Sequence, residues 1–165
     1  MTAPANPAAI PSLGTSLRRL IALLDGDVDR AYADAGLDFR AAFTPAIRAL
    51  LDGEPRSVRD LAVATASTHS AASQIVAQLK RAGLVQDAPS SDGRERRVRL
   101  SARGHDLLPE VTVIWRQADR AAAALDAELG VRLGDIINSA IETLGHRPFL
   151  TRAGQALGGA AEDQP

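Results

Sequence analysis

The middle of the chain contains residue types that can bind nucleic acid. An amide side chain such as that of Gln74 can make two hydrogen bonds to the edge of an adenine in the major groove. A guanidinium such as that of Arg94 is attracted by the negative potential of the minor groove. Short hydroxyl side chains suit contacts with phosphates and base edges. The candidates for DNA contact are Thr68, His69, Ser70, Ser73, Gln74, Arg94 and Arg96.

A helix from the capping residue Thr68 to about Ala82 is predicted to carry most of these candidates. Its apolar residues recur at i, i+3, i+4 and i+7, which is the spacing of one helical face; they are Ala72, Ile75, Val76 and Leu79. Gly83 ends the helix, because glycine accepts the left-handed turn after a helix. The outer face near the N-terminus then holds His69, Ser70, Ser73 and Gln74.

A second short helix is predicted immediately before this one. Ser57 and Asp60 form the S-x-x-D start of a helix, and Val58 and Leu61 point inward from it. Two short helices separated by a tight turn indicate a helix-turn-helix, whose second helix enters the major groove.

Two strands joined by an arginine-rich turn are predicted to follow. Residues 84–88 and 97–100 form the strands, and the sequence Pro89-Ser90-Ser91-Asp92-Gly93 lies between them. Asp92 stands two residues before Arg94, so its carboxylate can hold the guanidinium in place and support the tip of the hairpin. Alternation along the second strand places Arg97 and Arg99 on one face and Arg96 on the other.

The distribution of charge favours DNA more than the total does. The net charge of the chain is −1, which by itself argues against a nucleic-acid binder. Residues 80–103, however, carry seven basic and three acidic side chains, whereas residues 104–165 carry five basic and nine acidic ones. A basic block between neutral and acidic flanks is typical of a local phosphate contact.

The hairpin and the residues after it resemble the wing of the MarR family of bacterial transcriptional regulators. In that family the wing has a D-x-R turn, then a strand, then L-(T/S)-x-x-G at the start of a long helix; here these are Asp92-Gly93-Arg94 and Leu100-Ser101-Ala102-Arg103-Gly104. The resemblance implies a mainly α fold with a small β wing, in which a winged helix-turn-helix is flanked by N- and C-terminal dimerisation helices. It also implies a homodimer that binds a pseudo-palindromic DNA operator.

The rest of the chain fits this layout. Residues 1–11 are expected to be a disordered N-terminal segment and residues 146–165 a weakly ordered tail. A single domain is expected over residues 12–145, with a DNA-binding lobe at 44–104 and dimerisation helices at 12–43 and 105–145. Pro109 lies inside the last of these segments, and we expect it to bend or break the helix between His105 and Val111.

The resemblance further implies a small, often aromatic or phenolic, effector between the dimerisation helices and the lobe. Large aromatic side chains are scarce in this chain, and Tyr32, Phe43 and Trp115 stand on helices that should face one another. They are the candidate lining of an effector pocket. The alternative is that these three side chains simply fill the core.

Other classes of protein have little support. His69, His105 and His146 have no second ligand at metal-binding spacing, and no motif surrounds a nucleophile, so we expect no metal, no cofactor and no enzymatic activity. The chain has no cysteine and no apolar run long enough to span a membrane, which favours the cytoplasm. The sequence therefore predicts a ligand-responsive repressor that binds double-stranded DNA.

The alternative is a winged-helix module that binds another protein and no DNA. Such a module needs an apolar patch on the outer face of the second helix. Ser70, Ser73 and Gln74 argue against such a patch.

Overall fold

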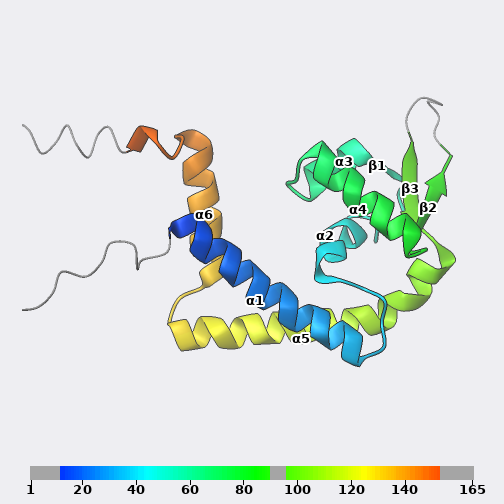
Figure 1. The fold of residues 1–165 in the computed structure, drawn as a ribbon, viewed down its shortest axis with the longest axis horizontal. Coiled ribbons are helices and arrows are strands. Elements are labelled where there is room, and N and C mark those ends of the chain that lie inside the picture. The colour runs from blue at the N-terminus through cyan, green and yellow to red at the C-terminus, as the bar shows by residue number, and fades with distance from the viewer. Residues whose placement is uncertain (1–11, 90–95, 153–165) are drawn as a thin grey trace, which may run out of the picture. The chain divides into compact units, whose positions relative to one another are not determined.

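A computed structural model describes residues 12–89 and 96–152 (Figure 1). The chain divides into two compact units, one up to Arg116 and the other from Gln117 onward. The fold is mostly helical with one small antiparallel sheet, as the sequence predicts.

The first unit begins with α1 (Leu13–Asp34). The hydroxyl oxygen of Ser12 accepts a hydrogen bond from the Thr15 amide at 3.2 Å and caps the helix. Gly36, at φ 72°, turns the chain after α1 in the left-handed conformation that glycine adopts readily. The short helices η2 (Ala41–Phe43) and α2 (Thr44–Arg48) follow. Ala49 is the C-cap of α2.

The helix-turn-helix and the sheet form the next part of this unit. Helices α3 (Val58–Ala64) and α4 (His69–Arg81) are followed by β2 (Val85–Ala88) and β3 (Arg97–Leu100), which pair antiparallel. A two-residue strand that the sequence did not predict, β1 (Arg56–Ser57), pairs with the other edge of β3. The strand order is β1-β3-β2.

One continuous apolar core holds the first unit together. Removing these side chains from water is the main favourable contribution to its folding. The core gathers the end of α1, the inner faces of α3 and α4, the strands and the first half of α5. Its largest members are Tyr32, Phe39, Phe43, Ile47, Leu50, Leu61, Leu79, Leu84, Leu100, Val111 and Trp115.

Helix α5 (Ala102–Leu129) starts directly against the turn that ends α4. The Ser101 hydroxyl donates to the Gly83 carbonyl at 2.6 Å and accepts from the Gly104 amide at 2.9 Å. Gly104 is buried, and a Cβ atom there would lie 2.2 Å from the Leu84 carbonyl oxygen. The serine and glycine of the L-S-x-x-G motif therefore allow the start of α5 to pack closely against the turn after α4.

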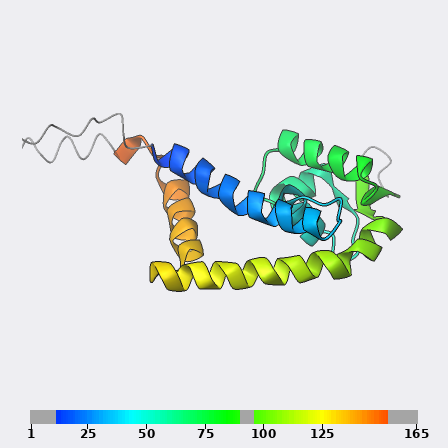
Figure 2. The same cartoon turned by 60° about the horizontal axis from the view of Figure 1, so that its bottom comes forward.

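Pro109 does not interrupt α5. The helix is continuous from Ala102 to Leu129, so the expectation of a local break is wrong. In both views the light-green start of α5 turns away from the line of the turns that follow it (Figures 1 and 2). A bend without a break is a common response to a proline inside a helix, because only one backbone hydrogen bond is lost.

The second unit contains the end of α5 and helix α6 (Leu133–His146). Gly130, at φ 70°, reverses the chain between them, and the Leu133 amide donates to the Asp126 carboxylate at 3.0 Å. No residue of α6 is buried, although the helix carries Ile136, Ile141 and Leu144.

The close packing of Gly104 against the Leu84 carbonyl leads to a first prediction. Gly104→Ala should destabilise the protein by roughly 3 kcal/mol or more, because the new methyl group meets backbone atoms that cannot move aside. Gly26→Ala is the matched control: Gly26 lies within α1 with no atom near its Cβ position, so this change should stabilise by up to about 1 kcal/mol. Urea unfolding of both variants measures the difference. Equal stabilities would show that the contact at Gly104 is unimportant.

Candidate nucleic-acid interface

A capping box fixes the start of α3. The Ser57 amide donates to the Asp60 carboxylate at 3.0 Å, and the Asp60 amide donates to the Ser57 hydroxyl at 3.1 Å. These two bonds satisfy backbone groups that have no partner inside the helix. The sequence predicted this cap, and the structure confirms it.

The turn between α3 and α4 has a defined geometry. Ala66 adopts φ 49°, which is uncommon for a residue other than glycine. The Thr65 hydroxyl donates to the Leu61 carbonyl at 2.8 Å and lies 2.9 Å from the Ser67 hydroxyl. Thr68 then caps α4, because its side chain accepts from the Ala71 amide at 3.2 Å.

Helix α4 presents a polar outer face. Ala72, Val76 and Leu79 are buried in the core, as their spacing predicts. The predicted DNA-contact residues of the helix and its cap are all exposed; they are Thr68, His69, Ser70, Ser73 and Gln74. The structure thus brings these five candidates together at the N-terminal end of one helix, with their side chains accessible.

The candidates of the wing are only partly described. Asp92 and Arg94 lie outside the described residues. Arg96 is exposed immediately before β3, and Arg99 is exposed within it, whereas Val98 and Leu100 are buried. The two faces of β3 therefore differ as alternation predicts, with the apolar residues toward the core.

Arg97 lies on the same face of β3 as Arg99, but it is partly buried against other parts of the lobe. Its guanidinium donates to the Pro55 carbonyl at 3.2 Å and lies 4.0 Å from the Asp60 carboxylate. The pKa of Asp60 is lowered, first by the hydrogen bond from the Ser57 amide and further by the Ser57 hydroxyl and the charges of Arg97 and Arg56, against a smaller opposing effect of desolvation. The strand that leads from the wing is thereby joined to the start of α3, a role that the charge pattern alone did not indicate.

A second ion pair joins α4 to the sheet. The Lys80 ammonium near the end of α4 bonds the Asp87 carboxylate of β2. This bond and the Lys80 charge lower the pKa of Asp87. Both groups are at the surface, so the pair orients the two elements more than it stabilises them.

The three aromatic residues proposed for an effector pocket are buried in the core. Tyr32 and Phe43 contact Phe39 edge to face, with ring centroids 4.9 and 5.7 Å apart. The Trp115 indole donates to the Thr44 hydroxyl at 3.2 Å, and the Arg48 guanidinium lies over its ring at 4.7 Å.

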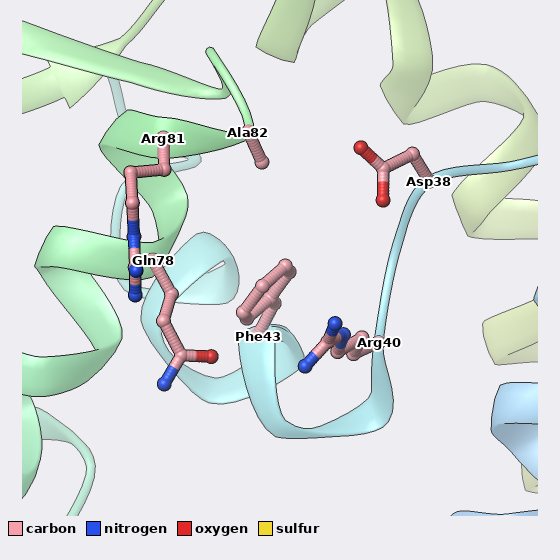
Figure 3. A pocket seen from close by; sticks show the side chains of 6 residues that line it. All are labelled: Asp38, Arg40, Phe43, Gln78, Arg81 and Ala82. Carbon is pink, nitrogen blue, oxygen red and sulfur yellow. The ribbon is translucent and has the colours of Figure 1, made fainter.

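A pocket lies beside one of these three residues, at Phe43. It has a volume of about 510 Å³ and is lined by Asp38, Arg40, Phe43, Gln78, Arg81 and Ala82. Figure 3 shows Gln78 and Arg81 extending from α4 on one side and Arg40 and Asp38 on the other, with the Phe43 ring between them. Sequence reasoning missed every residue of this lining except Phe43, because the two segments approach each other only in the folded chain.

Across 12–89 and 96–152, no group of three or more His, Cys, Asp or Glu side chains is placed to hold a metal ion. In the same ranges, no helix has the length and apolar character needed to cross a membrane.

Comparison with known proteins identifies the helix-turn-helix region. The model of the MarR family matches residues 44–95, which include α2, α3, α4 and β2. This region is therefore similar to the MarR family. The match confirms the resemblance that the wing motif predicted. No curated protein matches the chain.

Solved structures share the fold at low sequence identity. A MarR family transcriptional regulator from Silicibacter pomeroyi DSS-3 is 21% identical with a TM-score of 0.60, over 81% of this chain and 95% of that one. BpsR of Bordetella bronchiseptica is 23% identical with a TM-score of 0.57, over 72% and 82%. MepR of S. aureus, solved with DNA, is 14% identical with a TM-score of 0.62, over 81% and 94%. These likenesses establish a MarR-type winged-helix fold.

The lowered pKa of Asp60 leads to a prediction about the stability of the fold at low pH. A carboxyl group whose pKa lies below its ordinary value of 3.8 in the folded protein stabilises the fold above that pH and loses the effect as the pH falls through the lowered value. Asp60→Asn keeps an oxygen for the cap but removes the charge. The variant should be less stable than the original chain at pH 6, and the difference should shrink below pH 3.8.

Urea unfolding at several pH values measures this difference. Asp106→Asn, at an exposed position on α5 outside the capping box, is the matched control and should leave the acid dependence unchanged. A difference between the Asp60 variant and the original chain that stays constant with pH would contradict the assigned role of the charge.

Proposed function

We propose that this protein is a sequence-specific DNA-binding transcriptional regulator, a repressor that acts as a homodimer on a pseudo-palindromic operator. Each subunit places α4 in a major groove and Arg94 in the neighbouring minor groove. Two-fold symmetry then requires two half-sites about one helical turn apart.

The outer face of α4 carries this proposal. The helix is held in the core by its inner face, and it exposes one amide, two serine hydroxyls and an imidazole at its N-terminal end. Such groups match the donors and acceptors of base edges and phosphates. Gln74 is the base reader, whereas Ser70, Ser73 and His69 add contacts to phosphates or base edges. Among the solved structures of this fold is a MepR–DNA complex, which adds support.

The same exposed groups argue against the other classes of function. A winged-helix module that binds only protein needs an apolar surface, and every exposed candidate at the start of α4 is polar. Catalysis requires a nucleophile or base held by a partner, and the sequence contains no motif that supplies such a set. The MarR-family match of residues 44–95 is to regulators rather than enzymes.

A homodimer accounts for the apolar residues that one chain leaves exposed. Leu13, Leu17, Ile21 and Leu24 on α1 are 40–63% exposed, and they share one helical face. In the second unit Ile136, Ile141 and Leu144 are 42–62% exposed. Contiguous apolar patches of this kind mark interaction sites. We propose the segments 12–43 and 105–145 as dimerisation helices around the lobe at 44–104.

A small-molecule effector is the last part of the proposal. DNA binding of BpsR is regulated by 6-hydroxynicotinic acid, an aromatic acid. We propose that an aromatic or phenolic effector regulates this chain in the same way, near Tyr32, Phe43 and Trp115. It acts only through its difference in affinity for the DNA-competent and incompetent states.

The two proposed DNA readers can be separated by experiment. Gln74→Ala should reduce discrimination at one base position by about 1–3 kcal/mol, because it removes a bidentate contact. Arg94→Ala should weaken binding to all sequences and lower the slope of log K against log salt by roughly 1, because it removes one cation from the interface. Fluorescence anisotropy at several salt concentrations, with an operator selected from random DNA, measures both effects.

Two exposed residues outside the lobe and wing serve as controls. Gln117→Ala and Arg30→Ala remove the same side-chain types from α5 and α1 and should bind the operator as the original chain does. If the Gln74 and Arg94 variants also bind it with unchanged affinity and salt slope, the DNA assignment is wrong.

The dimer is tested on the exposed face of α1. The double change Leu17→Glu and Ile21→Glu places two charges on the apolar face and should convert a dimer into monomer or aggregate, since burying unpaired carboxylates is costly. Leu23→Glu is the matched control, because Leu23 is 61% exposed but lies off that face. Light scattering after size exclusion reports the mass. A dimer that survives the double change would rule out this interface.

A further inference from the structure

We propose that Ala77 is a second base reader of α4, whose methyl group recognises the 5-methyl group of a thymine next to the base pair read by Gln74. The assignment rests on the proposed function, because it concerns the operator that α4 would bind. It names a further specificity-determining residue and the base that this residue selects.

Ala77 lies on the outermost line of α4. Four exposed residues follow one another along this line at spacings of four, three and four residues, which places them on one side of a helix; they are Ser70, Gln74, Ala77 and Arg81. The residues of α4 that are buried in the core lie on the opposite side. The outer ridge of α4, defined by these four residues, therefore continues past Gln74 through Ala77.

Ala77 is the one apolar member of the outer ridge, and its methyl group is exposed in the folded chain. Gln74 and Arg81, about one turn away on either side, have much longer side chains. The surface of the ridge therefore lies closest to the helix axis at Ala77. An apolar group that projects from a base edge can meet the Ala77 methyl group there without displacing a polar contact.

Thymine supplies such a group in the major groove. Its 5-methyl group is the apolar feature of the base edges, whereas the other recognised groups are hydrogen-bond donors and acceptors. A methyl group placed against a donor or acceptor excludes water from it and leaves it without a partner, which costs free energy. A methyl group placed against the methyl group of thymine instead removes apolar surface from water. Ala77 therefore favours thymine over the other three bases.

The spacing of the two readers determines where the thymine lies. Three residues advance a helix by about 4.5 Å, and successive bases of one strand are roughly 3.4 Å apart along the duplex. Ala77 thus faces the base pair next to the one faced by Gln74. Because an amide recognises adenine, each half-site should contain an adenine contacted by Gln74 and, one base pair away on either strand, a thymine contacted by Ala77.

The packing of α4 holds Ala77 in place for this contact. Val76 and Leu79, which lie beside it in the sequence, are buried in the core. The turn after α4 is held by the bond from the Ser101 hydroxyl to the Gly83 carbonyl. The alanine side chain also has no rotamer freedom to lose when it meets a base. The methyl contact is therefore made by a group that is already ordered.

Replacing thymine by deoxyuridine tests the contact, because this change removes only the 5-methyl group. The probe is the operator that the full chain selects from random DNA, with each thymine replaced in turn, and fluorescence anisotropy measures the affinity. One thymine in each half-site should show a loss of roughly fourfold, the effect of one buried methyl group. It should lie next to the base pair at which Gln74→Ala reduces discrimination. Replacing the thymine in both half-sites should cost roughly sixteenfold, because separated positions are nearly additive.

The variant Ala77→Gly removes the methyl group of the protein instead. It should bind the thymine and deoxyuridine operators with equal affinity. The ratio of the two affinities is measured within each variant, so a lower folded fraction, which a glycine inside a helix can cause, cancels. Ala123→Gly, the same change at an exposed position on α5, is the matched control and should keep the fourfold ratio.

Three results would overturn the assignment of Ala77. These are the absence of any thymine whose methyl group affects binding, a sensitive thymine that does not adjoin the base pair read by Gln74, and the same affinity ratio in Ala77→Gly as in the original chain. Each of them leaves the proposed function standing, because the chain still binds an operator. A chain that selects no DNA from the random pool would contradict the proposed function, and the assignment of Ala77 with it.

Discussion

The close packing of α5 against the turn after α4 constrains the whole winged lobe. Ser101 bonds the Gly83 carbonyl through its hydroxyl and the Leu84 carbonyl through its amide, at 2.6 and 3.0 Å. Gly104 leaves no room for a side chain at the same point. The end of α4, the base of the hairpin and the start of α5 therefore meet within a few residues. Because packed backbone cannot deform by small amounts without cost, these three elements keep one arrangement relative to one another.

The Asp60 carboxylate connects the start of α3 to strand β3. Asp60 completes the cap of α3 and lies 4.0 Å from the Arg97 guanidinium of β3. Arg97 is thus partly buried against these partners, whereas Arg96, just before β3, and Arg99, within it, are exposed. A count of basic residues in the segment overstates the positive charge available to a ligand, because part of that charge is already paired. Burial and partners, rather than charge totals, decide which arginines are available to a phosphate.

Local patterns predicted most of the elements, because caps and glycines determine where helices end. Ser57, Thr68 and Gly83 stand where the sequence placed them, and β3 has the predicted bounds. Strand β1 was missed because two residues carry no periodicity and their pairing with β3 is non-local. The pocket was missed for the same reason: residues 38–43 and 78–82 are distant in sequence, and no pattern in either segment points to the other.

The packing of α4 limits how a ligand can act on DNA binding. Leu79 is fully buried and the turn at Gly83 is held by Ser101, so α4 cannot move without the sheet and the start of α5. The segment before η2 is joined to α1 by a few hydrogen bonds, among them the one between Ala41 and Asp29. The effector proposed for this chain would therefore act by changing the relation of this segment to the lobe, with the internal geometry of the lobe intact. The effect of a ligand on DNA binding then depends on the difference in its affinity for two states of the protein that place α4 differently.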